Sequence, residues 1–305
     1  MKFPDIGRAK RLERLAPPRG LVRMVLDTDT YNEIDDQFAV VYALLSQEKL
    51  DVEALYAAPF TNRETTDPAD GMEKSYQEIL RLLDRLEVAP EGYVFRGSTD
   101  YLSDWEHPVE SEAALDLVDR ALESHDDPLY VVAIGAITNV ASAILIEPEI
   151  IEHIVVVWLG GQPLYWPRAR HFNLGQDLYA SRLLFDCGVP LVHVPCDTVA
   201  SHLLTSVPEM AQYVRGQGAI GDYLFEIFQA YVEAHAALSK EIWDISTIAY
   251  LINDEWVPTE IVHSPILTDQ MTWSVDHSRH LMRQVTFVHR DPIFRDLFAK
   301  LRTCR

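Results

Sequence analysis

The stretch that decides the fold is Val25-Leu-Asp-Thr-Asp-Thr-Tyr-Asn-Glu-Ile-Asp-Asp-Gln-Phe-Ala39. A short apolar run at 21–26 precedes its first aspartate, and such a run predicts a buried strand. Beyond the last aspartate, apolar residues recur at helical spacing, at Phe38, Val41, Leu44 and Leu45. The stretch therefore predicts a strand, a loop and the start of a helix, with carboxylates at the strand end and in the first helical turn.

The aspartates of this stretch, Asp27, Asp29, Asp35 and Asp36, are expected to converge. Asp27 and Asp29 are two apart, so on an extended chain they share a face. Asp35 and Asp36 lie where a helix N-terminus stabilises negative charge. Converging carboxylates repel one another unless a cation or a shared proton compensates them, and a hard divalent cation prefers oxygen ligands. The stretch thus predicts a metal site at the carboxyl end of a strand, where open α/β sheets bind their ligands.

Strand-like and helical patterns alternate along most of the 305 residues. Strands are predicted at 21–27, 52–58, 129–134, 153–159 and 190–194, and helices near 36–48, 71–85, 111–124, 138–146 and 177–186. The pattern is chiefly helical over 207–253, and two late strands (265–275, 280–289) and a closing helix (291–301) follow. This order predicts an α/β fold with a mostly parallel central sheet flanked by helices and a helical cap region, in one domain over residues 1–305.

The composition indicates which binding partners and which cell compartment to expect. A formal net charge of −21 argues against binding to nucleic acid or to an anionic membrane, because phosphate recognition needs a basic surface. The cysteines, Cys187, Cys196 and Cys304, lack metal-type spacing and fit a reducing compartment. The N-terminus lacks the apolar core of a signal peptide, and the longest apolar run (154–160) is too short to span a bilayer. We therefore expect a soluble, cytoplasmic protein.

Two downstream segments are candidate partners of the aspartates. In 131–140 a strand ends at Ile134 and Gly135 allows a tight turn, which leaves a carbonyl for a cation; Thr138 or Asn139 is expected to cap the next helix, and an ordinary turn is the alternative. In 171–177 a polar loop carries imidazole and amide groups that suit sugar hydroxyls. A loop of mixed polarity is common, so neither segment decides a function alone.

A third candidate segment is 240–251. Asp244 opens a helix there, and a capping role is the alternative to a role in the site. Trp243 beside it offers a flat face for stacking.

Together these segments resemble the inosine–uridine-preferring nucleoside hydrolase family. The resemblance is carried by Asp27-Thr-Asp29, Asp35-Asp36, Ile134-Gly-Ala-Ile-Thr-Asn139, Phe172-Asn173 and Trp243-Asp244, and it extends to 186–199. It spans roughly residues 21 to 255, and the aspartate cluster is its most specific element.

The resemblance implies an enzyme that hydrolyses the N-glycosidic bond of a ribonucleoside, releasing base and ribose, with a calcium ion. The implied metal ligands are Asp29, Asp36, Asp244 and the carbonyl oxygen of Ile134, and Asp29 is also the implied general base. The implied substrate contacts are Asp35, Asn62, His171, Asn173, Trp243 and Asp244. Asp27 is expected to support the site. The resemblance also implies a homo-oligomer, a dimer or a tetramer.

The chain departs from the family pattern at several positions, and the family's usual asparagine upstream of Phe172 has no clear counterpart among residues 162–170. The turn Thr30-Tyr-Asn-Glu-Ile34 is longer than the usual family form and lacks its glycine, so Tyr31, Asn32 or Glu33 enters the pocket or the turn bulges outward. His171 stands where most members have a glutamate. Trp243 replaces a histidine that acts as an acid in many members; it resembles the purine-preferring branch and implies stacking on a purine. Trp105 or Trp166 would form the other wall, and His107, His171 and His202 are alternative acids.

Two competing interpretations remain at this stage. Asp27-Thr-Asp-Thr-Tyr31 also resembles the opening of the haloacid-dehalogenase-type phosphatases, which use magnesium, although Tyr31 breaks that pattern. A calcium-dependent nucleoside or ribose binder without turnover is the non-enzymatic interpretation. Its support is the altered turn and the missing glutamate.

Overall fold

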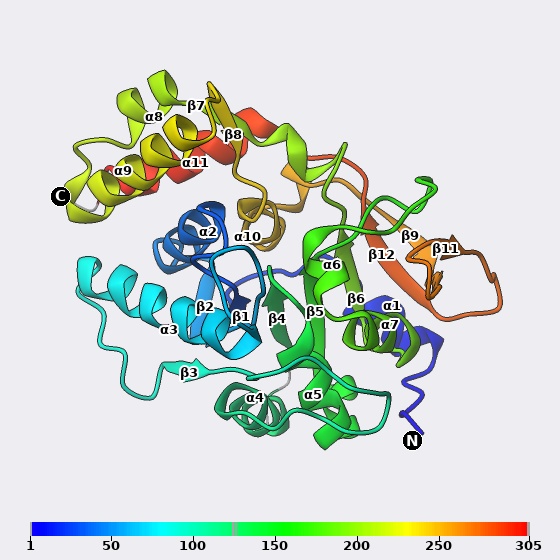
Figure 1. The fold of residues 1–305 in the computed structure, drawn as a ribbon. Helices are drawn as coiled ribbons and strands as arrows, with labels where there is room; N and C mark the ends of the chain where they lie inside the picture. Colours follow the sequence, from blue (N-terminus) through cyan, green and yellow to red (C-terminus); the bar gives the residue numbers. More distant parts are fainter. Residues whose placement is uncertain (1, 124, 126, 304–305) are drawn as a thin grey trace.

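The computed structural model describes residues 2–123, 125 and 127–303, and its centre is an eight-stranded sheet (Figure 1). The sheet order is β3-β2-β1-β4-β5-β6-β12-β9, and every neighbouring pair is parallel except β12 with β9. The strand bounds are Val94–Arg96 (β3), Leu50–Ala57 (β2), Val22–Thr28 (β1), Leu129–Ala133 (β4), Ile154–Leu159 (β5), Leu191–Val194 (β6), Leu281–Val285 (β12) and Thr259–His263 (β9). The predicted mostly parallel α/β sheet is confirmed.

Helices cover both faces of the sheet and bury an apolar core on each. Along β1, Met24 and Leu26 belong to one core and Val25 to the other, as expected for a strand buried on both faces. The first core includes residues of α2 (Asp35–Leu44), α3 (Pro68–Arg85), α10 (Ile245–Ile252) and α11 (Arg290–Leu301). The second includes residues of α4 (Glu112–Leu122), α5 (Thr138–Ile146) and α7 (Leu178–Asp186).

The predicted helical cap region consists of α8 (Val207–Tyr213) and α9 (Gly218–Ala234), and a two-stranded ribbon pairs the segment before α8 with the segment after α9. The ribbon pairs β7 (Leu204–Ser206) with β8 (Ser239–Glu241). Helix α9 packs against α8, α3 and β8, and the hydroxyl of its Tyr231 donates to Oε1 of Glu33, two residues before α2, at 3.4 Å. The cap therefore lies next to the first helical turn that carries the aspartates.

The prediction for the late strands was partly wrong. Residues 265–275 form the hairpin β10 (Ile266–Leu267) and β11 (Trp273–Ser274), separate from the main sheet. The polar turn between them interrupts the run: the amide of Met271 donates to the carbonyl of Thr268, and Met271 has a φ of 53°. One edge of the sheet is β9, which the sequence patterns did not predict. Also missed were β3, α1 (Arg8–Arg14) and α6 (Phe172–Gln176).

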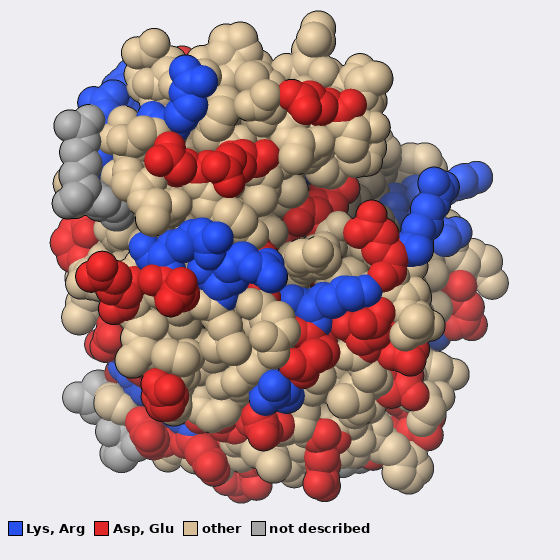
Figure 2. Space-filling view, turned by 60° about the vertical axis from the view of Figure 1, so that its left-hand side comes forward, with Lys and Arg blue, Asp and Glu red and all other residues tan. Residues whose placement is uncertain are grey.

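The acidic composition is visible on the surface. In Figure 2, Asp and Glu side chains are spread over the lower part of the face, whereas Lys and Arg gather in a band across its middle. Among the helices in the described part of the chain, none is both long and apolar enough to cross a membrane.

Candidate active site

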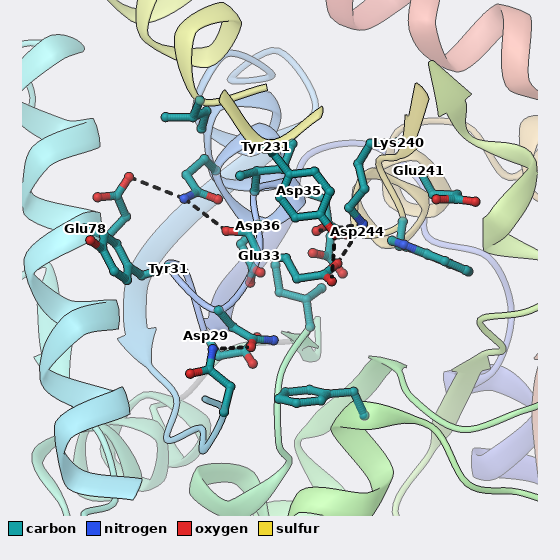
Figure 3. Close-up of a pocket in the computed structure, with 18 of the residues that line it drawn as sticks. Asp29, Tyr31, Glu33, Asp35, Asp36, Glu78, Tyr231, Lys240, Glu241 and Asp244 are labelled. Atoms are coloured by element: carbon teal, nitrogen blue, oxygen red, sulfur yellow. Dashed lines mark hydrogen bonds and ion pairs between the residues drawn. The ribbon is translucent and has the colours of Figure 1, made fainter. Parts of the chain in front are cut away.

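A cavity of about 1080 Å³ opens beyond the carboxyl ends of β1, β4 and β5, between the sheet and α9 (Figure 3). The residues that the family resemblance implies as metal ligands or substrate contacts all line it: Asp29, Asp35, Asp36, Asn62, Ile134, His171, Asn173, Trp243 and Asp244. Residues more than 200 positions apart thus meet at the sheet edge where parallel α/β folds place their ligands.

Buried carboxylates form the floor of the cavity. Asp35 and Asp36 open α2, and Asp244 immediately precedes α10. Carboxylate oxygens of these three residues lie within 4.8 Å of one another. Asp29 follows the end of β1, is 1% exposed, and its Oδ2 has no hydrogen-bond partner among the residues that the structure describes. The floor therefore has more acceptor atoms than the protein satisfies.

The buried carboxylates at this floor repel one another, so their charged forms need a compensating positive charge. Burial, followed by repulsion from Asp35, raises the pKa of Asp36 to about 8. The pKa values of Asp29 and Asp244 also lie well above the usual range, mainly because both carboxyls are buried and then because their neighbours are acidic. Burial and mutual repulsion thus disfavour the charged forms of these carboxyls unless a cation compensates them, so the floor is suited to bind positive charge.

The donor chemistry fits a hard divalent cation, because every candidate ligand atom is an oxygen. The carbonyl oxygen of Ile134 accepts a hydrogen bond from Nδ2 of Asn173 at 2.7 Å and keeps a second lone pair. One difference from the expectation is that the compact trio contains Asp35 in the place predicted for Asp29.

The alternative role of Asp244 as a helix cap is wrong. Asp244 occupies the N-cap position of α10, but its side chain makes no capping hydrogen bond. Instead, Oγ1 of Thr247 donates to the carbonyl oxygen of Asp244 at 2.8 Å. The carboxylate of Asp244 is therefore left to the cavity.

Asp27 lies behind the cavity and is held by Asn139. Nδ2 of Asn139 donates to Oδ1 of Asp27 at 2.7 Å and to the carbonyl oxygen of Ala57, while its Oδ1 accepts from the amide of Ser98. The expected cap of α5 by Thr138 or Asn139 is therefore wrong, since the N-cap position there has no side-chain hydrogen bond. Asn139 instead ties β1 to its neighbouring segments.

The longer turn after β1 folds over the cavity and does not bulge away from it. Tyr31, Asn32 and Glu33 all line the cavity. The backbone amide of Asn32 donates to the carbonyl oxygen of Asp29 at 2.9 Å. The side-chain Oδ1 of Asn32 accepts from Nδ2 of Asn62 at 3.2 Å. Oε2 of Glu33 accepts from Nζ of Lys240 at 2.6 Å. The extra length therefore adds polar groups to the site.

His171 is a neutral group in this cavity. Its Nδ1 lies 3.1 Å from Sγ of Cys196, and its ring centroid is 6.0 Å from that of Trp243. Burial lowers the pKa of His171 to about 4. His171 is thus unprotonated at neutral pH and is a poor choice for an acid there.

The other aromatic and histidine candidates lie outside the cavity. Among the described residues, its lining includes neither Trp105, Trp166, His107 nor His202. Trp105 packs edge-on against Tyr179, and His107 is exposed beside Asp104. These sequence-based assignments are not supported by the geometry.

One face of α9 supplies lining that the sequence reading missed, namely Tyr223, Ile227, Ala230, Tyr231 and Ala234. Their spacing of three and four residues is the signal that could have identified this face. Lys240 and His235 were missed as well. Nδ1 of His235 lies 2.8 Å from the carbonyl oxygen of Tyr231, and the two rings stack.

The sequence of the chain matches the family described as inosine-uridine preferring nucleoside hydrolase over residues 24–293. The chain therefore belongs to this family of enzymes. It is 26% identical over 182 residues to a putative pyrimidine-specific ribonucleoside hydrolase, RihB, of Shigella boydii serotype 4, a match that covers 57% of this chain and 72% of the relative. It is 27% identical over 160 residues to the pyrimidine-specific ribonucleoside hydrolase RihB of Escherichia coli K12, a match that spans half of each protein.

Solved structures share the fold over nearly the whole chain. A purine-preferring ribonucleoside hydrolase from Gardnerella vaginalis superposes with a TM-score of 0.76 at 20% identity, covering 92% of this chain and 98% of the other. The plant nucleoside hydrolase PpNRh1 gives a TM-score of 0.71 at 19% identity, covering 93% and 99%. At these identities the likeness establishes the fold, and the substrate must be argued from the site.

Proposed function

We propose that this chain is a calcium-dependent hydrolase of the N-glycosidic bond of a purine ribonucleoside. The observation that carries the proposal is the buried carboxylate floor, where Asp35, Asp36 and Asp244 converge and Oδ2 of Asp29 has no partner among the described residues. Such a set is stable when a cation and the hydroxyls of a sugar complete it.

Asp29, Asp36, Asp244 and the carbonyl oxygen of Ile134 would hold the calcium ion. When bound, calcium supplies a lowered pKa and a fixed orientation for a coordinated water. Asp29 accepts the proton of the attacking water at its unpartnered Oδ2, as a general base. Asp35, Asn173 and Asp244 bind the ribose hydroxyls. The sugar would pass through an oxocarbenium-like transition state, as in inverting glycoside hydrolysis.

The preference for a purine rests on Trp243. This residue lines the cavity beside Asp244 and offers a flat face to the leaving base. A purine buries more ring area by stacking than a pyrimidine does. The names of the relatives do not decide the base, since one relative is called pyrimidine-specific and another purine-preferring. For this chain the position of Trp243 favours the purine.

Release of reducing sugar tests the proposal directly. Purified protein is incubated with inosine, guanosine, adenosine, uridine and cytidine, before and after removal of metal by a chelator. Sugar release that is lost on chelation and restored by calcium, with purines ahead of pyrimidines, supports the proposal. Tight nucleoside binding without release would replace the hydrolase by the binder.

The family match favours the hydrolase over the phosphatase interpretation. Magnesium-dependent phosphate release from a generic phosphoester, without sugar release from nucleosides, would reverse this choice. We further propose a cytoplasmic location, which the cysteine pattern favours, and a homo-oligomer, a dimer or a tetramer, which the family resemblance implies. Light scattering of the purified protein measures the oligomeric state.

A further inference from the structure

Lys240 places a buried ammonium group in the cavity, a feature that the family resemblance does not explain. The side chain of Lys240 is only 6% exposed. Its Nζ lies 2.6 Å from Oε2 of Glu33 and 3.9 Å from Oδ1 of Asp35 (Figure 3). The same atom lies 5.4 Å from the ring centroid of Tyr231 and 5.7 Å from that of Trp243. A buried charge of this kind requires paired neighbours, and the two carboxylates provide them.

The ammonium group divides the carboxylate floor into two classes. Asp35 has a lysine nitrogen within ion-pair distance. Within the described residues, no lysine or arginine nitrogen comes within 4.0 Å of the carboxylates of Asp29, Asp36 or Asp244. The protein itself therefore compensates Asp35, and the other three carboxylates are left for an external cation.

Glu33 fixes the ammonium group on the Asp35 side of the floor. Glu33 belongs to the longer turn after β1, and Lys240 belongs to β8, so the pair joins the turn to the cap ribbon. The hydroxyl of Tyr231 also donates to Oε1 of Glu33, at 3.4 Å. The extended turn thus contributes the anchor of the ammonium group.

We propose that Lys240, anchored by Glu33, is a positioning residue that keeps Asp35 as a substrate-binding carboxylate and out of the metal coordination. The inference rests on the proposed function. Oxygens of Asp35 lie within 4.8 Å of those of Asp36 and Asp244, close enough for Asp35 to be drawn into binding the same cation. The lysine offsets the charge of Asp35 and opposes that competition. Its loss should therefore tighten calcium binding while weakening substrate binding.

The experiment measures calcium affinity and nucleoside kinetics on the same full-length variants. Calcium is titrated calorimetrically into metal-free wild type and Lys240→Met, and KM for inosine is measured at saturating calcium. We expect calcium to bind about tenfold more tightly to Lys240→Met, and KM to rise about tenfold. Lys240→Arg keeps the charge and should hold calcium affinity within about threefold of wild type.

A double variant separates positioning from net charge. Glu33→Gln with Lys240→Met has the same formal charge as wild type, yet it lacks the ammonium group that restrains Asp35. Tighter calcium binding should persist in it relative to wild type, which carries the same formal charge. If the Lys240→Met protein does not fold, as judged by its circular dichroism melt, the double variant is compared with wild type instead, because it leaves no unpaired carboxylate at position 33.

The outcomes are distinct. Wild type that binds no calcium would overturn the proposed function and this inference with it. Wild type that binds calcium, with unchanged or weaker affinity in Lys240→Met, would overturn the inference alone. Tightening that vanishes in the double variant would also overturn it, because the effect would then be one of net charge.

Discussion

A β-carbon added at Gly135 would lie 2.8 Å from Oδ1 of Asp29. Gly135 follows the end of β4 and Asp29 the end of β1, and these strands are neighbours in the sheet. Nε1 of Trp158 donates to the carbonyl oxygen of Gly135 at 3.1 Å and holds that backbone in place. The absence of a side chain at Gly135 is therefore what leaves room for the carboxylate of Asp29.

We predict that Gly135→Ala lowers kcat/KM at least about tenfold, because a displacement of about 1 Å in a reacting group is costly. The catalytic floor moves, whereas the apolar cores do not, so the melting temperature should change little. Gly175→Ala is the matched control, because the nearest atom to its added β-carbon is 3.9 Å away. Equal kinetics for the two variants would show that the space beside Asp29 does not matter.

Asp29→Asn should reduce kcat by at least about a thousandfold, because the amide cannot accept the proton of the attacking water. The shape of the side chain is kept, so calcium should still bind, but weakly. Steady-state kinetics with inosine and a calorimetric calcium titration measure the two effects separately. Activity within about tenfold of wild type would remove Asp29 from the role of base.

The local part of this site could be predicted from the sequence. The spacing of Asp27, Asp29, Asp35 and Asp36 predicts their convergence, because strand and helix periodicity act over a few residues. The fold class followed from the same kind of pattern, and the structure confirmed it. The Trp243-Asp244 pair, remote in sequence, was assigned only through the family resemblance, and the structure places both in the cavity.

Contacts formed between distant segments could not be predicted. Lys240 and Glu33 are 207 residues apart, and nothing in either local pattern indicates the ion pair. The sequence predicts a cap at Thr138 or Asn139, yet the N-cap position is Ile137 and the amide of Asn139 donates to the buried carboxylate of Asp27. In the 265–275 run, a turn of only a few polar residues turned an expected strand into a hairpin outside the sheet.

Calcium should stabilise the fold as well as support turnover. The buried carboxylates repel one another, and a ligand that binds only the native state raises its stability. We expect saturating calcium to raise the melting temperature of metal-free wild type by several degrees, about 2–4 °C for each kcal/mol at this size. Asp244→Asn should show a smaller rise in the same calorimetric scan. A wild-type melting temperature unaffected by calcium would contradict this prediction.

Trp243→Ala should reduce kcat/KM for inosine more than for uridine, by about fivefold to tenfold relative to one another, since a stacked aromatic pair contributes about 1 kcal/mol. Trp243→Phe keeps a ring and should restore part of the difference. Parallel kinetics on both nucleosides provide the measurement. Equal losses on both nucleosides in the alanine variant would remove the stacking argument for a purine.

His193 provides a pH prediction away from the metal floor. It is fully buried in β6, and its Nε2 lies 2.7 Å from the carbonyl oxygen of Gly160. Burial lowers its pKa to about 4. Because the unfolded chain has an ordinary histidine pKa of about 6.5, it binds one more proton than the native state between these values. The stability that the native protein gains from keeping His193 unprotonated is therefore fully present above pH 6.5 and is lost as the pH falls toward 4.

His193→Gln should remove this dependence while keeping a hydrogen-bond donor for Gly160. Wild type should lose about 2 kcal/mol more stability than the variant between pH 7.5 and pH 5, from the protonation of this one group in the unfolded state. Urea unfolding of both proteins at the two pH values measures this difference. The difference in unfolding free energy between wild type and variant at pH 7.5 gives the cost of the substitution itself. The same loss in both proteins would mean that His193 titrates alike in the folded and unfolded states, contrary to its burial against Phe185 and Trp273.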